Sequence, residues 1–124
     1  MPQTAVGVYQ ESPDEVPPVD WLASLSEKKK IRAKCRTKID RLAELGELRR
    51  PEADYLRDGI YELRIGYRGM NYRILYAFAG HQIALLTHGI LKEDRVPSQE
   101  IENAVICKQK WEKNRKVHTF QKPL

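Results

Sequence analysis

Three segments in the second half of the chain alternate between apolar and polar residues. In residues 60–67 both tyrosines share one face with Leu63 and Ile65, and Arg64 lies on the other. Residues 71–78 repeat this pattern with Arg73 opposite the tyrosines, and residues 82–88 alternate in the same way. A period of two is typical of β-strands, and glycines between the segments favour tight turns. The pattern therefore predicts a three-stranded antiparallel meander.

The flanking segments follow the period of a helix instead. Residues 26–45 carry apolar side chains at helical spacing, and Gly46 is a suitable terminator. A short helix is predicted after Asp20, and a final helix is predicted to begin near Ser98, because both residue types favour helix N-termini. Residues 5–9 are rich in β-branched and aromatic side chains, which predicts a short N-terminal strand.

The remaining segments lack a clear period. Residues 12–18 contain three prolines and are expected to form a loop, and residues 48–58 are broken by Pro51. Residues 116–124 are mostly polar, so we expect a frayed tail. The predicted order is β-α-α-β-β-β-α in a single domain over residues 1–124. We expect an α+β fold, with a twisted, mainly antiparallel sheet, an N-terminal helical hairpin and a C-terminal helix.

The length and the absence of long apolar runs favour a single soluble domain. A chain of 124 residues holds one core, and no apolar run is long enough to span a membrane. Acidic Glu11, Asp14 and Glu15 stand where a signal peptide needs a basic start and an apolar run, so a cytoplasmic protein without membrane contact is expected.

The cysteines and histidines predict no cofactor or metal site. Cys35 and Cys107 are too few for a disulfide framework and are expected to be reduced thiols. The three histidines lack the spacing of zinc ligands, so no metal site is expected.

Positive charge is concentrated in the segment of the second predicted helix. The chain has a formal net charge of +5, and residues 28–41 hold eight cations against one acid, Asp40. The cations are Lys28, Lys29, Lys30, Arg32, Lys34, Arg36, Lys38 and Arg41. Such a surplus favours a polyanionic partner, as in nucleic-acid binding. A solvated helix face that serves solubility explains the same pattern equally well.

Four segments together resemble one known family. They are residues 56–64 (LRDGIYELR), 72–76 (YRILY), 85–92 (LLTHGILK) and 97–104 (PSQEIENA). In this order and spacing the chain resembles toxins of the RelE/ParE superfamily, and is most similar to the HigB branch. The resemblance implies a microbial-RNase-like fold and a toxin of a type II toxin–antitoxin system. It further implies ribosome-dependent mRNA cleavage that inhibits translation, and neutralisation by a cognate antitoxin.

Cleavage of RNA by its own 2′-hydroxyl needs a base, cations near the phosphate and an acid, but no metal. If the strands pair in register, Arg64 and Arg73 converge on one phosphate, with Arg73 as the main clamp. His88 would transfer protons, and Lys92 would stabilise charge. Alternatively, Arg64 forms a surface salt bridge with Glu62 or with an acid of a neighbouring strand, and His88 is only a satisfied polar residue.

The loop after the third strand departs from the family pattern. Lys92 is followed by Glu93, where the family often has a second cation, which raises the question of full catalytic strength. Arg95 is a partial substitute for the missing cation. Under the resemblance, Arg95 and the basic helix contact mRNA and ribosomal RNA, and the same surface suits an acidic antitoxin segment. This RNA-binding set comprises Lys28, Lys29, Lys30, Arg32, Lys34, Arg36, Lys38 and Arg95.

Two alternative functions remain open. A ParE-like toxin shares the fold but inhibits DNA gyrase, and has no need of a cluster of arginine, histidine and lysine. A catalytically weak RNA-binding homologue is consistent with Glu93.

Overall fold

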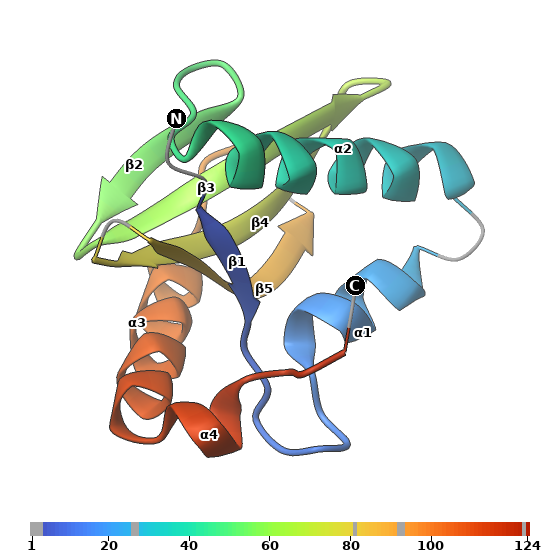
Figure 1. The fold of residues 1–124 in the computed structure, drawn as a ribbon. Coiled ribbons are helices and arrows are strands. Elements are labelled where there is room, and N and C mark those ends of the chain that lie inside the picture. The colour runs from blue at the N-terminus through green and yellow to red at the C-terminus, as the bar shows by residue number, and fades with distance from the viewer. Residues whose placement is uncertain (1–3, 26–27, 81, 92–93, 123) are drawn as a thin grey trace.

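The computed structural model describes residues 4–25, 28–80, 82–91, 94–122 and 124. The elements follow in chain order (Figure 1). They are β1 (Ala5–Val8), α1 (Pro17–Ser24), α2 (Lys29–Leu45), β2 (Ala53–Arg57), β3 (Ile60–Tyr67), β4 (Met70–Ala79), β5 (Ile83–Leu91), α3 (Ser98–Lys113) and α4 (Arg115–His118).

The strands form one mixed five-stranded sheet in the order β1-β5-β4-β3-β2. The predicted meander is confirmed as β3, β4 and β5, which pair antiparallel, whereas β1 pairs parallel with β5. The first strand therefore lies beside the last strand of the meander, from which it is far apart in the sequence. The fold is α+β, as the sequence predicts.

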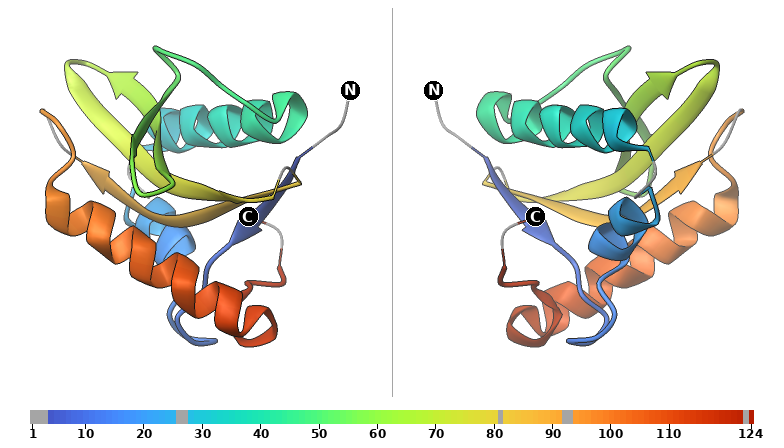
Figure 2. Two further views of the ribbon diagram at one scale, coloured as in Figure 1. Left: turned by 90° about the vertical axis from the view of Figure 1, so that its left-hand side faces the viewer. Right: turned by 90° about the vertical axis from the view of Figure 1, so that its right-hand side faces the viewer.

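Helices cover both faces of the sheet, as the two side views show (Figure 2). On one face, buried residues of α2 such as Cys35 and Leu42 share a core with Leu63, Ile74 and Tyr76. On the other face, Ile101 and Ala104 of α3 pack on residues of β3, β4 and β5. The alternation of the strands thus divides the side chains between two cores.

The expected helical hairpin is only partly formed. Both N-terminal helices contribute to the same core, but α1 packs mainly on β5 and α2 on β3 and β1. Trp21 of α1 lies so close to the sheet that a Cβ atom on Gly89 would be 2.1 Å from its ring. Each helix is therefore positioned by its own strand.

Two expectations about irregular segments were wrong. Residues 53–57 form β2, in which Ala53 pairs with Leu63, although we expected an irregular segment. The helix α1 begins at Pro17, inside the expected loop, because proline fits the first turn, where its missing N–H is not needed. Asp20 lies within this helix, and its carboxylate accepts a hydrogen bond from the Val16 N–H at 3.0 Å.

The described part of residues 116–124 also differs from the expected frayed tail. It begins in α4 and then runs beside the N-terminal segment, where Thr119 forms a bridge with Tyr9. The Phe120 N–H donates to the Val8 carbonyl at 2.8 Å, and the Trp111 indole donates to the Thr119 hydroxyl at 2.8 Å. Long-range contacts of this kind are invisible in the local pattern of a polar segment.

Candidate functional site

The register of two neighbouring strands brings Arg64 and Arg73 together. Arg64 of β3 is the direct partner of Arg73 on β4. Glu62 precedes Arg64 by two residues and therefore projects from the same face, opposite the tyrosines. The pairing in register on which the predicted convergence depends is thus present.

Glu62 lies between the two arginines and is almost fully buried. Its side chain is 2% exposed and accepts a hydrogen bond from Arg64 Nε. Arg73 Nε is 3.8 Å from Glu62 Oε1, within ion-pair range but beyond a hydrogen bond. Arg64 also contacts Asp54 Oδ2 at 3.2 Å from its Nη2 atom. The salt bridge between Arg64 and Glu62 therefore exists alongside the convergence of the arginines.

Arg73 is buried with hydrogen-bonding capacity to spare. Its side chain is 8% exposed, and Nε and Nη1 have no hydrogen-bond partner among the described residues. Leaving buried charged donors unsatisfied costs several kcal/mol, so such a group requires an explanation, and a bound anion is one. An anion with two oxygen atoms matches the planar fork of this guanidinium.

A cleft of about 490 Å³ opens over these side chains. Its described lining includes four arginines, Arg57, Arg64, Arg73 and Arg95, and three acids, Asp54, Glu62 and Asp94. We call it the arginine cleft. It unites three cations that the sequence singles out, Arg64, Arg73 and Arg95, although their roles there remain predictions.

Arg57 is the cation of the cleft that was not expected from the sequence. It contacts the Ser98 hydroxyl at 2.7 Å and Glu102 at 3.0 Å, which joins β2 to the start of α3. The neighbouring carboxylates raise the Arg57 pKa, so the side chain stays charged. Arg57 belongs to the segment 56–64 that carries the resemblance, but it was overlooked because residues 48–58 were expected to be irregular.

His88 projects from the same face of the sheet but does not line the arginine cleft. Its Nε2 atom lies 3.1 Å from Glu100 Oε1 and its Nδ1 atom 3.2 Å from the Thr87 hydroxyl. Burial lowers the pKa of His88, and the nearby Glu100 carboxylate only partly opposes this shift. The imidazole is therefore neutral above its ordinary pKa of 6.5. Because a carboxylate only accepts, Nε2 carries the ring hydrogen.

The lysine loop lies outside the described residues. Lys92 and Glu93, on which the predicted charge stabilisation and the departure from the family pattern depend, both fall there. Their roles therefore stay predictions.

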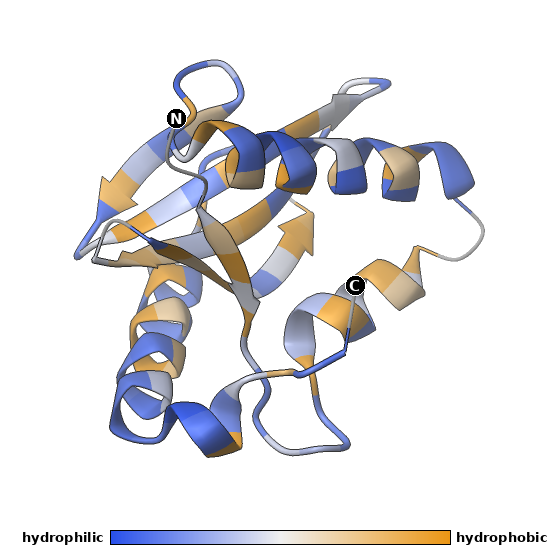
Figure 3. Cartoon of the chain, viewed as in Figure 1, coloured by the Kyte–Doolittle hydropathy of each residue, from blue (hydrophilic) through white to orange (hydrophobic). Residues whose placement is uncertain are grey.

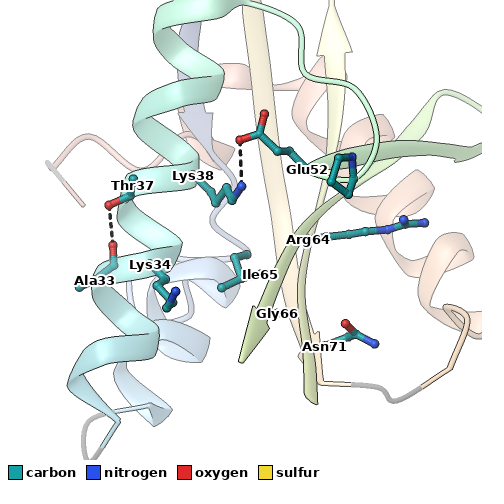
Figure 4. Close-up of a pocket in the computed structure, with 10 residues that line it drawn as sticks. Ala33, Lys34, Thr37, Lys38, Glu52, Arg64, Ile65, Gly66 and Asn71 are labelled. Carbon is teal, nitrogen blue, oxygen red and sulfur yellow. Dashed lines mark hydrogen bonds and ion pairs between the residues drawn. The ribbon is translucent and has the colours of Figure 1, made fainter. Parts of the chain in front are cut away.

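The basic residues of α2 are distributed over three cavities. Figure 3 shows this helix as mainly hydrophilic. Lys28, Lys29 and Lys30 line a cavity of about 580 Å³. Lys34 and Lys38 line one of about 650 Å³ between α2 and β3 (Figure 4). The other two cations that α2 gives to the predicted set, Arg32 and Arg36, line a third cavity beside Leu124. Apart from Arg95, the cations of the predicted RNA-binding set thus line neighbouring cavities along one helix, and their role in RNA binding stays a prediction.

Some of these cations already have partners within the protein. Lys38 contacts Glu52 at 2.8 Å and Arg41 contacts the same carboxylate at 2.7 Å, which lowers the Glu52 pKa to about 2. Arg36 donates to the Leu124 carbonyl. Lys28, Lys29 and Lys30 form no ion pair with a described residue, although the Lys28 ammonium donates to the Tyr72 hydroxyl at 3.3 Å.

Neither a metal-binding cluster nor a membrane-spanning helix is found among the described residues. No group of three or more His, Cys, Asp or Glu side chains in this part of the chain is placed to hold a metal ion. None of its helices combines the length and the hydropathy that a bilayer crossing requires.

Comparison with known proteins places the chain in a family. The family model described as "Phage derived protein Gp49-like (DUF891)" matches residues 20–113, well over half of the chain, including the arginine cleft. None of the curated proteins gives a significant match. The chain belongs to the Gp49-like family of phage-derived proteins, which is part of the RelE/ParE-like superfamily of toxins from toxin–antitoxin systems.

Proposed function

We propose that this protein is the toxin of a type II toxin–antitoxin system, similar to the HigB branch, and that it cleaves mRNA on the ribosome. The observation that carries the proposal is Arg73, which is buried in the arginine cleft beside three further arginines, with two donors that have no hydrogen-bond partner among the described residues. A phosphodiester supplies the two anionic oxygens that these donors lack. The family supports a toxin, and the cleft supports the nuclease.

The proposed reaction is a transfer of the phosphate within the RNA. The 2′-oxygen attacks the adjacent phosphorus, its proton passes to a base, and the bond to the 5′-oxygen breaks. The leaving 5′-oxygen takes up a proton, and a 2′,3′-cyclic phosphate remains. Arg73 and Arg64 stabilise the charge that grows on the non-bridging oxygens, and Lys92 adds a further positive charge.

His88 is the proposed group for proton transfer. It pairs with Leu75, two residues from Arg73 on the same face of the sheet, and its neutral imidazole is able to accept a proton near neutral pH. Glu100 stabilises the imidazolium that results, because its carboxylate lies 3.1 Å from Nε2. This step uses no metal or cofactor.

The proposed partners are ribosomal RNA, mRNA and an antitoxin, because each of them carries negative charge that would pair with the basic side chains. The basic side chains of α2, together with Arg95, would dock on ribosomal RNA and mRNA by contacts to phosphates, which are independent of sequence. An acidic segment of an antitoxin would neutralise the same cations. Because ribosomes are the site of action, we place the protein in the cytoplasm.

Induction of the protein in bacteria, followed by mapping of mRNA 5′ ends, tests the proposal. New ends within translated frames that disappear with the Arg73→Ala variant are expected. Growth arrest with DNA damage but without new ends would instead indicate a gyrase inhibitor. Unaffected growth would indicate an RNA-binding homologue without activity.

A further inference from the structure

The arginine cleft and a cavity between α2 and β3 share one lining residue, Arg64. Arg64 lines both the cleft and the cavity of about 650 Å³ between α2 and β3. Figure 4 shows Lys34 and Lys38 facing this cavity from α2, while the Arg64 side chain extends away from the helix. A ligand that leaves the cleft along Arg64 therefore arrives beside the basic helix.

The edge of β3 is open at this point. The pairing of β2 with β3 ends at Leu63, and the last backbone contact on that side runs from the Arg64 N–H to the Glu52 carbonyl. No described strand pairs with the outer side of β3 beyond Arg64. Gly66 follows, is exposed, and has no atom within 4 Å of the position that a Cβ would occupy. Space for a chain to pass around the sheet edge is therefore available.

Beyond this edge lies a groove without described acids. It is the cavity of about 580 Å³ that Lys28, Lys29, Lys30 and Arg68 line, together with Tyr67. Tyr67 connects it with the cavity above, because Lys34 Nζ lies 6.0 Å and Arg68 Cζ 5.2 Å from the centre of its ring. None of the four lining cations forms an ion pair with a described residue.

We propose that the arginine cleft, the open edge at Gly66 and the lysine groove at the start of α2 form one track for single-stranded RNA. This inference rests on the proposed function for its substrate and adds the path that the strand follows. We call this path the RNA track. The scissile phosphate lies at Arg73, and the flanking nucleotides pass over Gly66 towards Lys30.

The shape of the RNA track selects a flexible strand. A duplex is too stiff to turn around the edge of one β-strand, since even DNA has a persistence length of about 150 base pairs, whereas a single strand is flexible enough. The helix from Lys28 to Lys38 adds roughly 15 Å to the path. Single-strand grooves combine cations that contact the backbone with aromatic rings on which bases stack, as Arg68 and Tyr67 are placed to do here, and those of OB-fold proteins hold on the order of 4–16 nucleotides.

Binding of a fluorescent RNA that cannot be cleaved tests the RNA track. The probe is a series of 2′-O-methyl oligonucleotides of two to twelve nucleotides, whose blocked 2′-oxygen prevents reaction. We expect affinity to rise with length and then level off, and a duplex of equal length to compete poorly. A dinucleotide that binds as tightly as the longest strand, or a duplex that competes equally well, would overturn the RNA track.

Two substitutions locate the strand. Gly66→Glu places an acid on the open edge, and Gly66→Gln is its neutral control of equal size. Lys30→Glu reverses a charge in the groove but favours the fold, because an acid is stabilising in the first turn of a helix. Its control is Lys113→Glu, an equal change of charge at the distant end of α3.

We expect Gly66→Glu and Lys30→Glu each to lower the affinity for the probe by about tenfold at low salt. A plot of the logarithm of affinity against the logarithm of salt concentration should become shallower by about 0.7 for each phosphate that the variant no longer neutralises. Equal losses in Gly66→Gln or Lys113→Glu would contradict a defined path, as would competition by poly-glutamate at equal charge. If both track variants bind the probe normally and only Arg73→Ala binds it more weakly, the RNA track is overturned but the arginine cleft remains an RNA-binding site. If the track variants weaken RNA binding but the unaltered protein does not cleave mRNA, the proposed function is overturned and the RNA track stands.

Discussion

Arg64 and Arg73 occupy directly opposed positions on β3 and β4, and the buried carboxylate of Glu62 lies between them. Two neighbouring guanidinium groups repel each other, and the buried carboxylate of Glu62 reduces this repulsion. Arg64 has a second carboxylate partner in Asp54, whereas Nε and Nη1 of Arg73 have no hydrogen-bond partner among the described residues, so we expect a further anion to bind at Arg73. This relationship leads to the first two predictions.

Replacement of Arg73 separates activity from stability. We expect Arg73→Leu to lower the rate of mRNA cleavage by about two to three orders of magnitude, because a donor to the developing charge is removed. The melting temperature should stay unchanged or rise, since an unsatisfied buried cation is removed. Cleavage of ribosome-bound mRNA and thermal unfolding measure the two effects. The exposed Arg49→Ala variant is the control, and a strong loss of stability in Arg73→Leu would contradict this assignment.

Replacement of Glu62, in contrast to that of Arg73, should lower the stability of the fold. Glu62→Gln keeps the shape of the side chain but removes the negative charge beside the buried Arg73 and one of the two carboxylates that pair with Arg64. We expect the free energy of unfolding to fall by about 3 kcal/mol, the usual effect of breaking a buried pair. Asp54→Asn, whose partner Arg64 is partly exposed, should cost less than about 1 kcal/mol. Urea unfolding compares the two variants, and equal losses would show that burial of Glu62 is unimportant.

The pH dependence of cleavage tests His88. Because burial lowers its pKa, a neutral His88 that acts as a base should lose activity only as the pH falls below 6.5, through the pKa of the folded protein. Glu100 raises this pKa, so Glu100→Gln should move the acidic limb of the rate profile to lower pH. The exposed Glu112→Gln variant should leave the limb in place. A limb that does not move in Glu100→Gln would remove His88 from the mechanism.

The packing of Trp21 on Gly89 predicts an effect on stability alone. A Cβ at residue 89 would be 2.1 Å from the indole ring, so Gly89→Ala should lower the free energy of unfolding by about 1–3 kcal/mol. The matched control is Gly66→Ala, where the new methyl group meets no atom within 4 Å. Combining Gly89→Ala with Trp21→Leu should cost less than the sum of the single changes. Additive losses in urea unfolding would show that the clash is relieved elsewhere.

The local pattern of the chain was sufficient for the strands of the meander and for the faces they expose. An alternation of two places Arg64 and Arg73 on the side opposite the tyrosines in any strand that forms. The terminator Gly46 was equally local, because its left-handed φ of 75° suits a residue without a Cβ. These features depend on neighbours within a few residues, which the sequence displays directly.

Features that depend on distant residues were decided only by the tertiary structure. β2 forms because its residues pair with β3, as Ala53 does with Leu63. The C-terminal segment is held by a bridge between Thr119 and Tyr9, which lie more than one hundred residues apart in the sequence. The arginine cleft gains Arg57 in the same way, through β2 and the start of α3. The sequence alone determined which side chains share one face of each strand, since that follows from periodicity. The tertiary structure decided which of them are buried and left without a partner, since burial and pairing are properties of packed elements.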